Sequence, residues 1–172
     1  MNTELVPIKD ILLVEDDPQD VELTLTWLEE CHLAQRVAVV HDGEKALDYL
    51  YRRGIFQMRA GGNPILVLLD LKMPKVNGLE VLKTIKADEQ LKIIPVVVFS
   101  SSREARDVIE CYKLGVNAYV VKPMDFGEFM NAVKQLGLFW TALNEPPPQP
   151  WREEASIQGN EVAFRGAEQP AK

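Results

Sequence analysis

Short runs of apolar residues recur along the chain. Four of them are uninterrupted: ILLV at 11–14, PILVLL at 64–69, PVVVF at 95–99 and AYVV at 118–121. A fifth, VAVV at 37–40, precedes the turn residues His41-Asp42-Gly43. A strand with one face in water alternates apolar and polar positions, whereas a parallel strand covered on both faces does not. The pattern therefore predicts five buried parallel strands.

The segments between these runs carry the apolar spacing of helices. Asp17 is a favourable N-cap, Pro18 suits the first helical position, and Val21, Leu25 and Leu28 then share one face, which predicts a helix from about Pro18 to Cys31. Comparable stripes predict four more helices: Ala46-Leu47-Leu50, Leu79-Leu82-Ile85 after Gly78, Val108-Ile109-Tyr112 ending near Gly115, and Phe126-Phe129-Val133-Leu136 after Asp125. This alternation predicts an α/β fold, a doubly wound five-stranded parallel sheet with five flanking helices.

Two regions depart from the alternation. Residues 52–63 (RRGIFQMRAGGN) are long and Gly-containing for a connection, which predicts an extended loop. Residues 145–172 hold five of the eleven prolines and lack periodicity, which predicts a Pro-rich, disordered tail. We therefore expect an N-terminal extension at 1–8, one folded domain at 9–144 and a tail at 145–172.

Composition and charge argue against some classes of binding partner and cellular location. The 172 residues carry a formal charge of -7, which argues against nucleic-acid or anionic-membrane binding, because both require clustered Lys and Arg. Cys31 and Cys111 lie in helical patterns without a CxxC motif, which indicates buried thiols in a reducing compartment. The first apolar run is too short for a signal peptide, and no window approaches the ~20 apolar residues of a membrane span. We therefore expect a cytoplasmic protein.

Polar residues follow the predicted strands. Glu15-Asp16-Asp17 follows the first, Asp70 the third, Ser100-Ser101-Ser102 the fourth and Lys122-Pro123 the fifth. The carboxyl ends of the strands in such a sheet form the usual ligand crevice. Converging carboxylates ~4 Å apart repel by roughly 4 kcal/mol per pair at a dielectric of ~20, so the cluster calls for a cation, and oxygen ligands suit Mg²⁺ or Mn²⁺. For Glu15 and Asp16 alone, helix capping is the alternative.

Four segments, in order and spacing, resemble the signatures of the receiver domain of two-component response regulators: ILLVEDDP, LLDLKMPKVNG, VVVFSSS and AYVVKP. The similarity spans about Lys9 to Trp140. It implies the strand order 2-1-3-4-5 and a protein that takes a phosphoryl group from a histidine kinase onto Asp70. Such a protein is a phosphoacceptor that signals through protein contact, not an enzyme acting on a separate substrate. A role as phosphate sink or phosphorelay intermediate is the alternative.

The resemblance also assigns roles to the neighbouring residues. Glu15 and Asp16 match the acidic pair that, with Asp70 and the main-chain carbonyl of Lys72, positions Mg²⁺, with Mn²⁺ as a substitute. Ser100 matches the switch hydroxyl, Tyr119 the aromatic switch residue, and Lys122 the lysine that pairs with the phosphoryl oxygens. In this family the corresponding Lys-Pro peptide bond is usually cis, so the resemblance implies a cis bond between Lys122 and Pro123. An arbitrary X-Pro bond is cis only ~5% of the time.

Three rival classes fit less well. A haloacid dehalogenase phosphatase needs a second Asp two residues after the nucleophile, where this chain has Lys72. A flavodoxin-like carrier needs a phosphate-binding loop, where Glu15-Asp16-Asp17-Pro18 would repel FMN. A pseudo-receiver would lack a key residue, and none is missing.

The loop at 52–63 and the apolar Leu138-Phe139-Trp140 resemble the small response regulators of bacterial and cyanobacterial phytochromes. This resemblance implies a light-sensing histidine kinase as partner, and a homodimer formed through helix four, strand five and helix five. The alternative for Phe139 and Trp140 is that they cover the core of their own chain.

Overall fold

A computed structural model describes residues 10–30, 32–60 and 62–148. Its parallel sheet has the strand order β2-β1-β3-β4-β5, as predicted. The elements are β1 Ile11–Val14, α1 Pro18–Glu30, β2 Val37–Val40, α2 Gly43–Tyr51, β3 Leu66–Leu69, α3 Gly78–Ala87, β4 Val96–Ser100, α4 Ala105–Lys113, β5 Ala118–Val121 and α5 Phe126–Leu138. The predicted extension, Cys31 and residues 149–172 of the tail lie outside the described residues.

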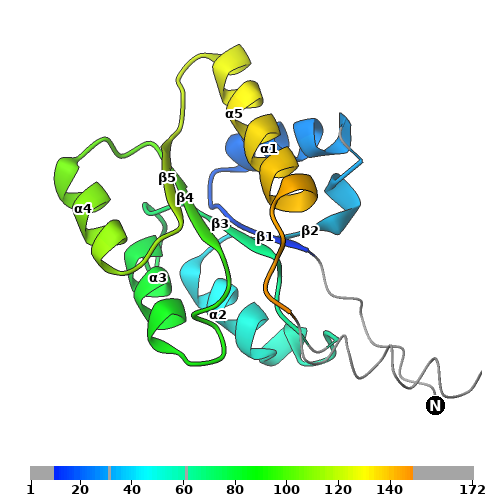
Figure 1. The fold of residues 1–172 in the computed structure, drawn as a ribbon, viewed down its shortest axis with the longest axis vertical. Helices are drawn as coiled ribbons and strands as arrows, with labels where there is room; N and C mark the ends of the chain where they lie inside the picture. Colours follow the sequence, from blue (N-terminus) through cyan, green and yellow to red (C-terminus); the bar gives the residue numbers. More distant parts are fainter. Residues whose placement is uncertain (1–9, 31, 61, 149–172) are drawn as a thin grey trace, which may run out of the picture.

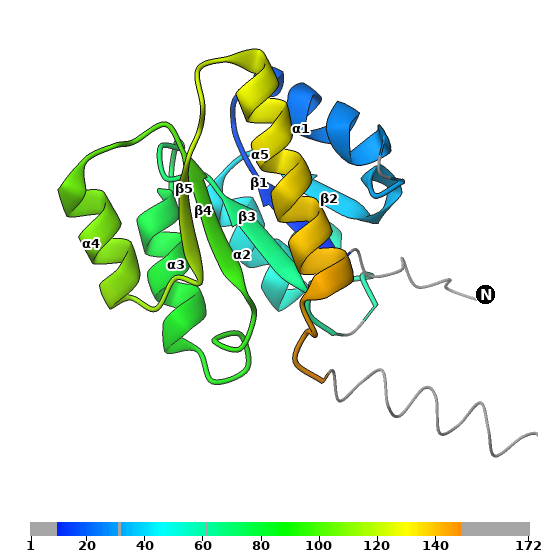
Figure 2. The same cartoon turned by 45° about the horizontal axis from the view of Figure 1, so that its top comes forward.

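The helices form two layers around the sheet (Figure 1, Figure 2). Helices α1 and α5 cover one face, where Leu28 and Val133 pack with Ile11, Leu13 and other strand residues. Helices α2, α3 and α4 cover the other face, over the alternate positions of the same strands. Successive strand residues point to opposite faces, so an uninterrupted apolar strand supplies both cores at once.

Burial follows the position of each strand in the sheet. Strands β1, β3 and β4 are buried along their whole length, which confirms the interpretation of their apolar runs. The edge strand β5 is only half-buried throughout, and the middle of β2 at the other edge is half-buried too. An edge strand has one strand neighbour, so helices cover it less completely.

The apolar stripe of α4 differs from the prediction. Ile109 is 54% exposed and Tyr112 is 55% exposed, whereas Cys111 is fully buried as expected. The helix lies beside the edge strand β5 and turns Cys111 toward the sheet, so the stripe expected to face the core is largely on the surface. The spacing of the apolar residues predicted the position of this helix correctly, but it did not predict which of its residues are buried.

The loop at 52–63 is not simply extended. A turn of 3-10 helix spans Gly54–Phe56, and Arg59 is only 4% exposed. The Arg59 guanidinium donates to the carbonyl oxygens of Tyr49 at 3.1 Å and Gly62 at 2.9 Å. The last carbonyls of a helix lack partners within the helix and attract cations, so Arg59 fixes this loop to the end of α2.

The two aromatic residues after α5 have different environments. Trp140 is 9% exposed and joins the core between α1, α5 and the sheet, whereas Phe139 is 47% exposed. Both lie in a short π-helix, Phe139–Leu143. Trp140 thus covers the core of its own chain, and Phe139 remains available on the surface.

Candidate functional site

The strand ends converge as the sequence predicts. Asp70 follows β3, and its N–H donates to the carbonyl oxygen of Val14 at 3.0 Å. The N–H of Glu15 donates to the carbonyl oxygen of Val40, also at 3.0 Å. On the other side, the N–H of Lys122 donates to Ser100 at 2.9 Å. Ladder hydrogen bonds therefore run up to the functional residues, and the sheet itself sets their spacing.

Two local features shape the entrances to the site. Asp17 caps α1, because its carboxylate accepts from the N–H of Gln19 at 2.8 Å. A Cβ at Gly78 would lie 2.0 Å from the Asp70 carbonyl oxygen and 2.7 Å from the Leu71 Cα. Only glycine lets α3 begin this close to the strand end.

Three carboxylates form one cluster. Glu15, Asp16 and Asp70 each bring an oxygen to within 4.8 Å of the others. Glu15 is 3% exposed and Asp70 is 6% exposed, whereas Asp16 faces solvent. Burial raises the pKa of Glu15 to about 7 although contacts with Lys122 oppose the shift, and burial likewise raises the pKa of Asp70 against the attraction of Lys122.

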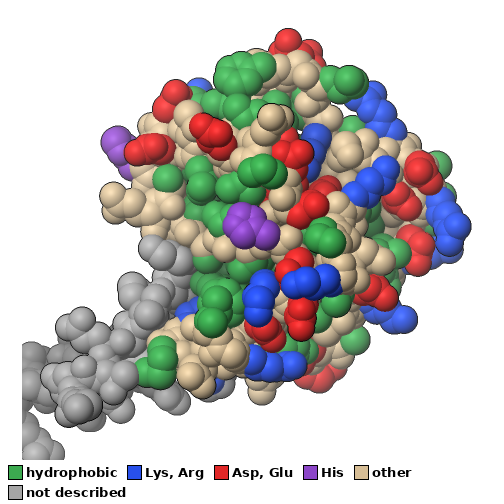
Figure 3. Space-filling model, turned by 180° about the vertical axis from the view of Figure 1, so that it is seen from behind, with side chains coloured by type: hydrophobic (Ala, Val, Ile, Leu, Met, Phe, Trp, Pro, Cys, Tyr) green, Lys and Arg blue, Asp and Glu red, His purple; other side chains and the backbone are tan. Residues whose placement is uncertain are grey.

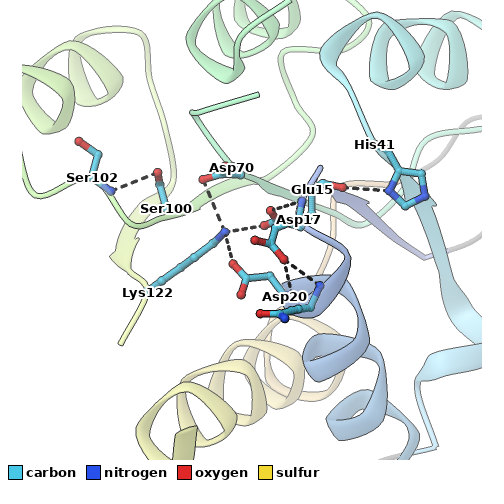
Figure 4. A network of polar contacts seen from close by, with 9 residues as sticks. Glu15, Asp17, Asp20, His41, Asp70, Ser100, Ser102 and Lys122 are labelled. Carbon is cyan, nitrogen blue, oxygen red and sulfur yellow. Dashed lines mark hydrogen bonds and ion pairs between the residues drawn. The ribbon is translucent and has the colours of Figure 1, made fainter. Parts of the chain in front are cut away.

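Lys122 is the cation of the site, and its ammonium is shared among acidic groups (Figure 4). Its Nζ lies 2.6 Å from Glu15 Oε2 and 2.7 Å from Asp20 Oδ2, but 3.7 Å from Asp70 Oδ1. Burial alone would lower the lysine pKa, but the hydrogen bonds to Asp20 and Glu15 outweigh that effect and raise it. Asp20 was missed from the sequence; its only signal is an acid in the first turn of α1.

The bond between Lys122 and Pro123 corrects one expectation. Within the part of the chain that the structure describes, no peptide bond is cis, so this bond is trans. A trans bond is favoured by ~0.5–1 kcal/mol even before proline. The long lysine stem still delivers the ammonium to the acidic cluster from the end of β5.

The predicted switch residues lie beside the loop between β4 and α4. Ser100 is fully buried, and its hydroxyl accepts from the N–H of Ser102 at 3.3 Å. The Tyr119 hydroxyl donates to the carbonyl oxygen of Ser102 at 3.0 Å. Ser102 in turn donates to the Asp107 carboxylate of α4 at 2.5 Å. A displacement of Ser100 therefore has a direct route to α4.

The donor set fits a divalent metal ion. The Asp70 Oδ1 oxygen is buried and has no hydrogen-bond partner among residues 10–30, 32–60 and 62–148. Such an oxygen beside two further carboxylates is a favourable ligand set for a hard cation. Lys72, whose carbonyl is the fourth expected ligand, is exposed and lies in the loop two residues beyond Asp70.

Among the described residues, no helix combines the length and apolar character needed to cross a membrane. Acidic and basic side chains are interspersed over the face that Figure 3 shows. The cluster of three carboxylates at the strand ends coincides with the site that the sequence predicts.

Comparison with known proteins agrees with this geometry. The protein-family model for the response regulator receiver domain matches residues 11–134 of this chain. The response regulator Rcp1 of Synechocystis sp. is 37% identical over 140 residues, which cover 81% of this chain and 94% of Rcp1. A solved structure of the Mn²⁺-bound form of Rcp1 aligns with a TM-score of 0.76 at 36% identity, covering 81% of this chain and 99% of that one.

Two further solved structures are similar. The phosphorylated cyanobacterial phytochrome response regulator RcpA aligns with a TM-score of 0.76 at 38% identity, covering 82% of this chain and 99% of that one. The bacteriophytochrome response regulator AtBRR is 57% identical, with a TM-score of 0.63 and coverage of 83% and 99%. With the acidic cluster, the strand order and the receiver match in agreement, the chain belongs to the response regulator receiver domain family.

Proposed function

We propose that this protein accepts a phosphoryl group from a histidine kinase onto Asp70 and signals by the conformational change that follows. The observation that carries the proposal is the Asp70 carboxylate itself. It is buried, it has one oxygen without a hydrogen-bond partner among the described residues, and it lies between an acidic pair and a lysine ammonium. Most buried side-chain oxygens with a purely structural role have a hydrogen-bond partner.

The transfer exchanges one bond for another. An oxygen of Asp70 forms a bond to phosphorus while the N–P bond of a phosphohistidine breaks, and the electron pair of that bond returns to the imidazole nitrogen. Lys122 offsets negative charge on the phosphoryl oxygens. Glu15, Asp16, Asp70 and the Lys72 carbonyl would hold Mg²⁺ or Mn²⁺, which supplies further charge neutralisation when bound.

The added phosphoryl group gives Ser100 and Tyr119 their roles. A phosphoryl group adds about 1.5 to 2 negative charges at neutral pH, judged from other phosphorylated side chains. The Ser100 hydroxyl can then donate to a phosphoryl oxygen. This movement would shift Ser102, whose N–H donates to Ser100 and whose carbonyl oxygen accepts from the Tyr119 hydroxyl. Contacts made in only one state shift the population toward that state.

We infer that the partner kinase is a phytochrome-type photoreceptor. The support is the similarity to AtBRR and RcpA, whose names identify them as phytochrome response regulators. The inference is tested by measuring the rate of phosphotransfer to this protein from a bacteriophytochrome kinase and from a kinase of another sensory class. Equal rates from the two kinases would contradict it.

We further propose a homodimer through α4, β5 and α5. The half-buried edge strand β5 and the exposed Ile109, Tyr112 and Phe126 support this surface, because large apolar groups in water favour association. Sedimentation of the wild type against Ile109→Asp/Tyr112→Asp tests it. The wild type should sediment as a dimer and the variant as a monomer; two monomers would remove the proposal.

The phosphoacceptor assignment has its own test. The protein is incubated with acetyl phosphate and Mg²⁺, and phosphoryl incorporation is followed by intact mass. We expect the wild type to be labelled and Asp70→Asn to remain unlabelled, with Asp88→Asn as an equally conservative control that keeps the label. Undiminished label on Asp70→Asn would overturn the assignment.

A further inference from the structure

Asp20 contacts the ammonium of Lys122 as closely as Glu15 does. The distances from Nζ are 2.7 Å to Asp20 Oδ2 and 2.6 Å to Glu15 Oε2. Asp20 lies in the first turn of α1, and its side chain is 27% exposed, whereas that of Lys122 is 9% exposed. A carboxylate outside the predicted site therefore takes part in binding the Lys122 ammonium.

The hydrogen-bond donors of Lys122 show what this contact does. An ammonium has three N–H donors, and two of them are within hydrogen-bond distance of Glu15 and Asp20. Asp70 Oδ1, at 3.7 Å, is beyond a hydrogen bond. Figure 4 shows Asp20 and Asp70 on opposite sides of the ammonium. Asp20 thus draws the cation away from the phosphoacceptor.

We propose that Asp20 is a positioning residue that holds Lys122 short of Asp70 and so keeps the phosphoacceptor oxygen open for reaction. The inference rests on the proposed function, since it concerns the same carboxylate. Glu15 cannot supply this restraint alone, because its carboxylate belongs to the cluster that contains Asp70. An ammonium held only by Glu15 could pivot toward Asp70, whereas a second anchor on α1 prevents that movement.

Loss of the Asp20 charge would change the resting state of the site. A neutral amide attracts the ammonium less strongly than a carboxylate does. Lys122 would then move about 1 Å closer to Asp70 and convert the present 3.7 Å ion pair into a direct hydrogen bond, which would have to break before the oxygen could attack phosphorus. A displacement of this size in a reacting site lowers rates by up to roughly 100-fold.

The test is the rate of labelling by acetyl phosphate in the presence of Mg²⁺. We expect Asp20→Asn to slow labelling by about 10- to 100-fold. Asp20→Glu, which keeps the charge, should recover most of the rate. Glu22→Gln is the matched control, because it removes an exposed acid from the same end of α1 and should label at the wild-type rate. Wild-type labelling of Asp20→Asn, or no recovery in Asp20→Glu, would overturn the proposal.

A second arm separates positioning from helix stability. Asp20→Asn is combined with Lys122→Met, and the labelling rates of the double and single variants are compared. Because Asp20 acts through the lysine, its substitution should have no further effect once the lysine is gone. An equal slowing in both backgrounds would show that Asp20 acts through α1 instead. Absence of label from the wild type, or label that survives Asp70→Asn, would instead contradict the proposed function.

Discussion

Substitution of Glu15 by Gln should change how stability depends on pH. Glu15 is 3% exposed, and burial, the largest influence, raises its pKa from 4.5 to about 7 in spite of Lys122. The folded state therefore binds the proton of Glu15 more tightly than the unfolded state does. The free energy of unfolding must fall as pH rises from about 4.5 to about 7, because ionisation is easier in the unfolded chain.

The size of the effect follows from the two pKa values. At roughly 1.4 kcal/mol per pH unit, a rise from 4.5 to about 7 corresponds to about 3 kcal/mol. Glutamine has a similar shape and cannot ionise, so Glu15→Gln lacks this loss. Relative to the wild type, the variant should become more stable by about 3 kcal/mol between pH 4 and pH 8.

Urea unfolding measures this difference directly. Wild type, Glu15→Gln and the exposed control Glu30→Gln are unfolded in EDTA at intervals from pH 4 to pH 8, and each free energy of unfolding is extrapolated to water. The free energy of unfolding of Glu30→Gln should change with pH in the same way as that of the wild type. If Glu15→Gln also ran parallel to the wild type, Glu15 would not be a buried, reluctantly ionised carboxyl, and the electrostatic description of the site would be wrong.

Three further outcomes follow from the packing. Gly78→Ala should lose about 1–3 kcal/mol of unfolding free energy in urea and slow acetyl phosphate labelling, because its Cβ would overlap main-chain atoms; unchanged values for both would contradict the crowding. Trp140→Ala should lose about 3–5 kcal/mol because it empties a buried site, whereas Phe139→Ala should lose less than about 1 kcal/mol. Sedimentation of Phe139→Ala then tests the dimer without damage to the core, and a dimer as strong as that of the wild type would exclude Phe139 from the interface.

The central strands were predictable because their environment is simple. A strand covered on both faces must be apolar at every position, so the runs ending at Val14, Leu69 and Phe99 locate β1, β3 and β4 almost to the residue. Their carboxyl ends meet at one edge of a parallel sheet. The convergence of Glu15, Asp16 and Asp70 therefore follows from strand order alone.

Features that depend on side-chain reach were not predictable. Asp20 and Lys122 are 102 positions apart, and nothing in the pattern near either residue indicates their contact. Arg59 in a Gly-containing loop resembles a solvated side chain, yet main-chain carbonyl oxygens at the end of α2 bind it. The exposure of Ile109 depends on how α4 lies against an edge strand, and helical periodicity does not contain that information.

The most direct test of the central claim is chemical mapping of the phosphorylated residue. The protein is phosphorylated with acetyl phosphate and Mg²⁺, treated with borohydride to reduce the acyl phosphate to an alcohol, and digested for peptide mass spectrometry. We expect homoserine at position 70 in the wild type, with no other aspartate converted. Conversion at a different aspartate, with Asp70 intact, would contradict it.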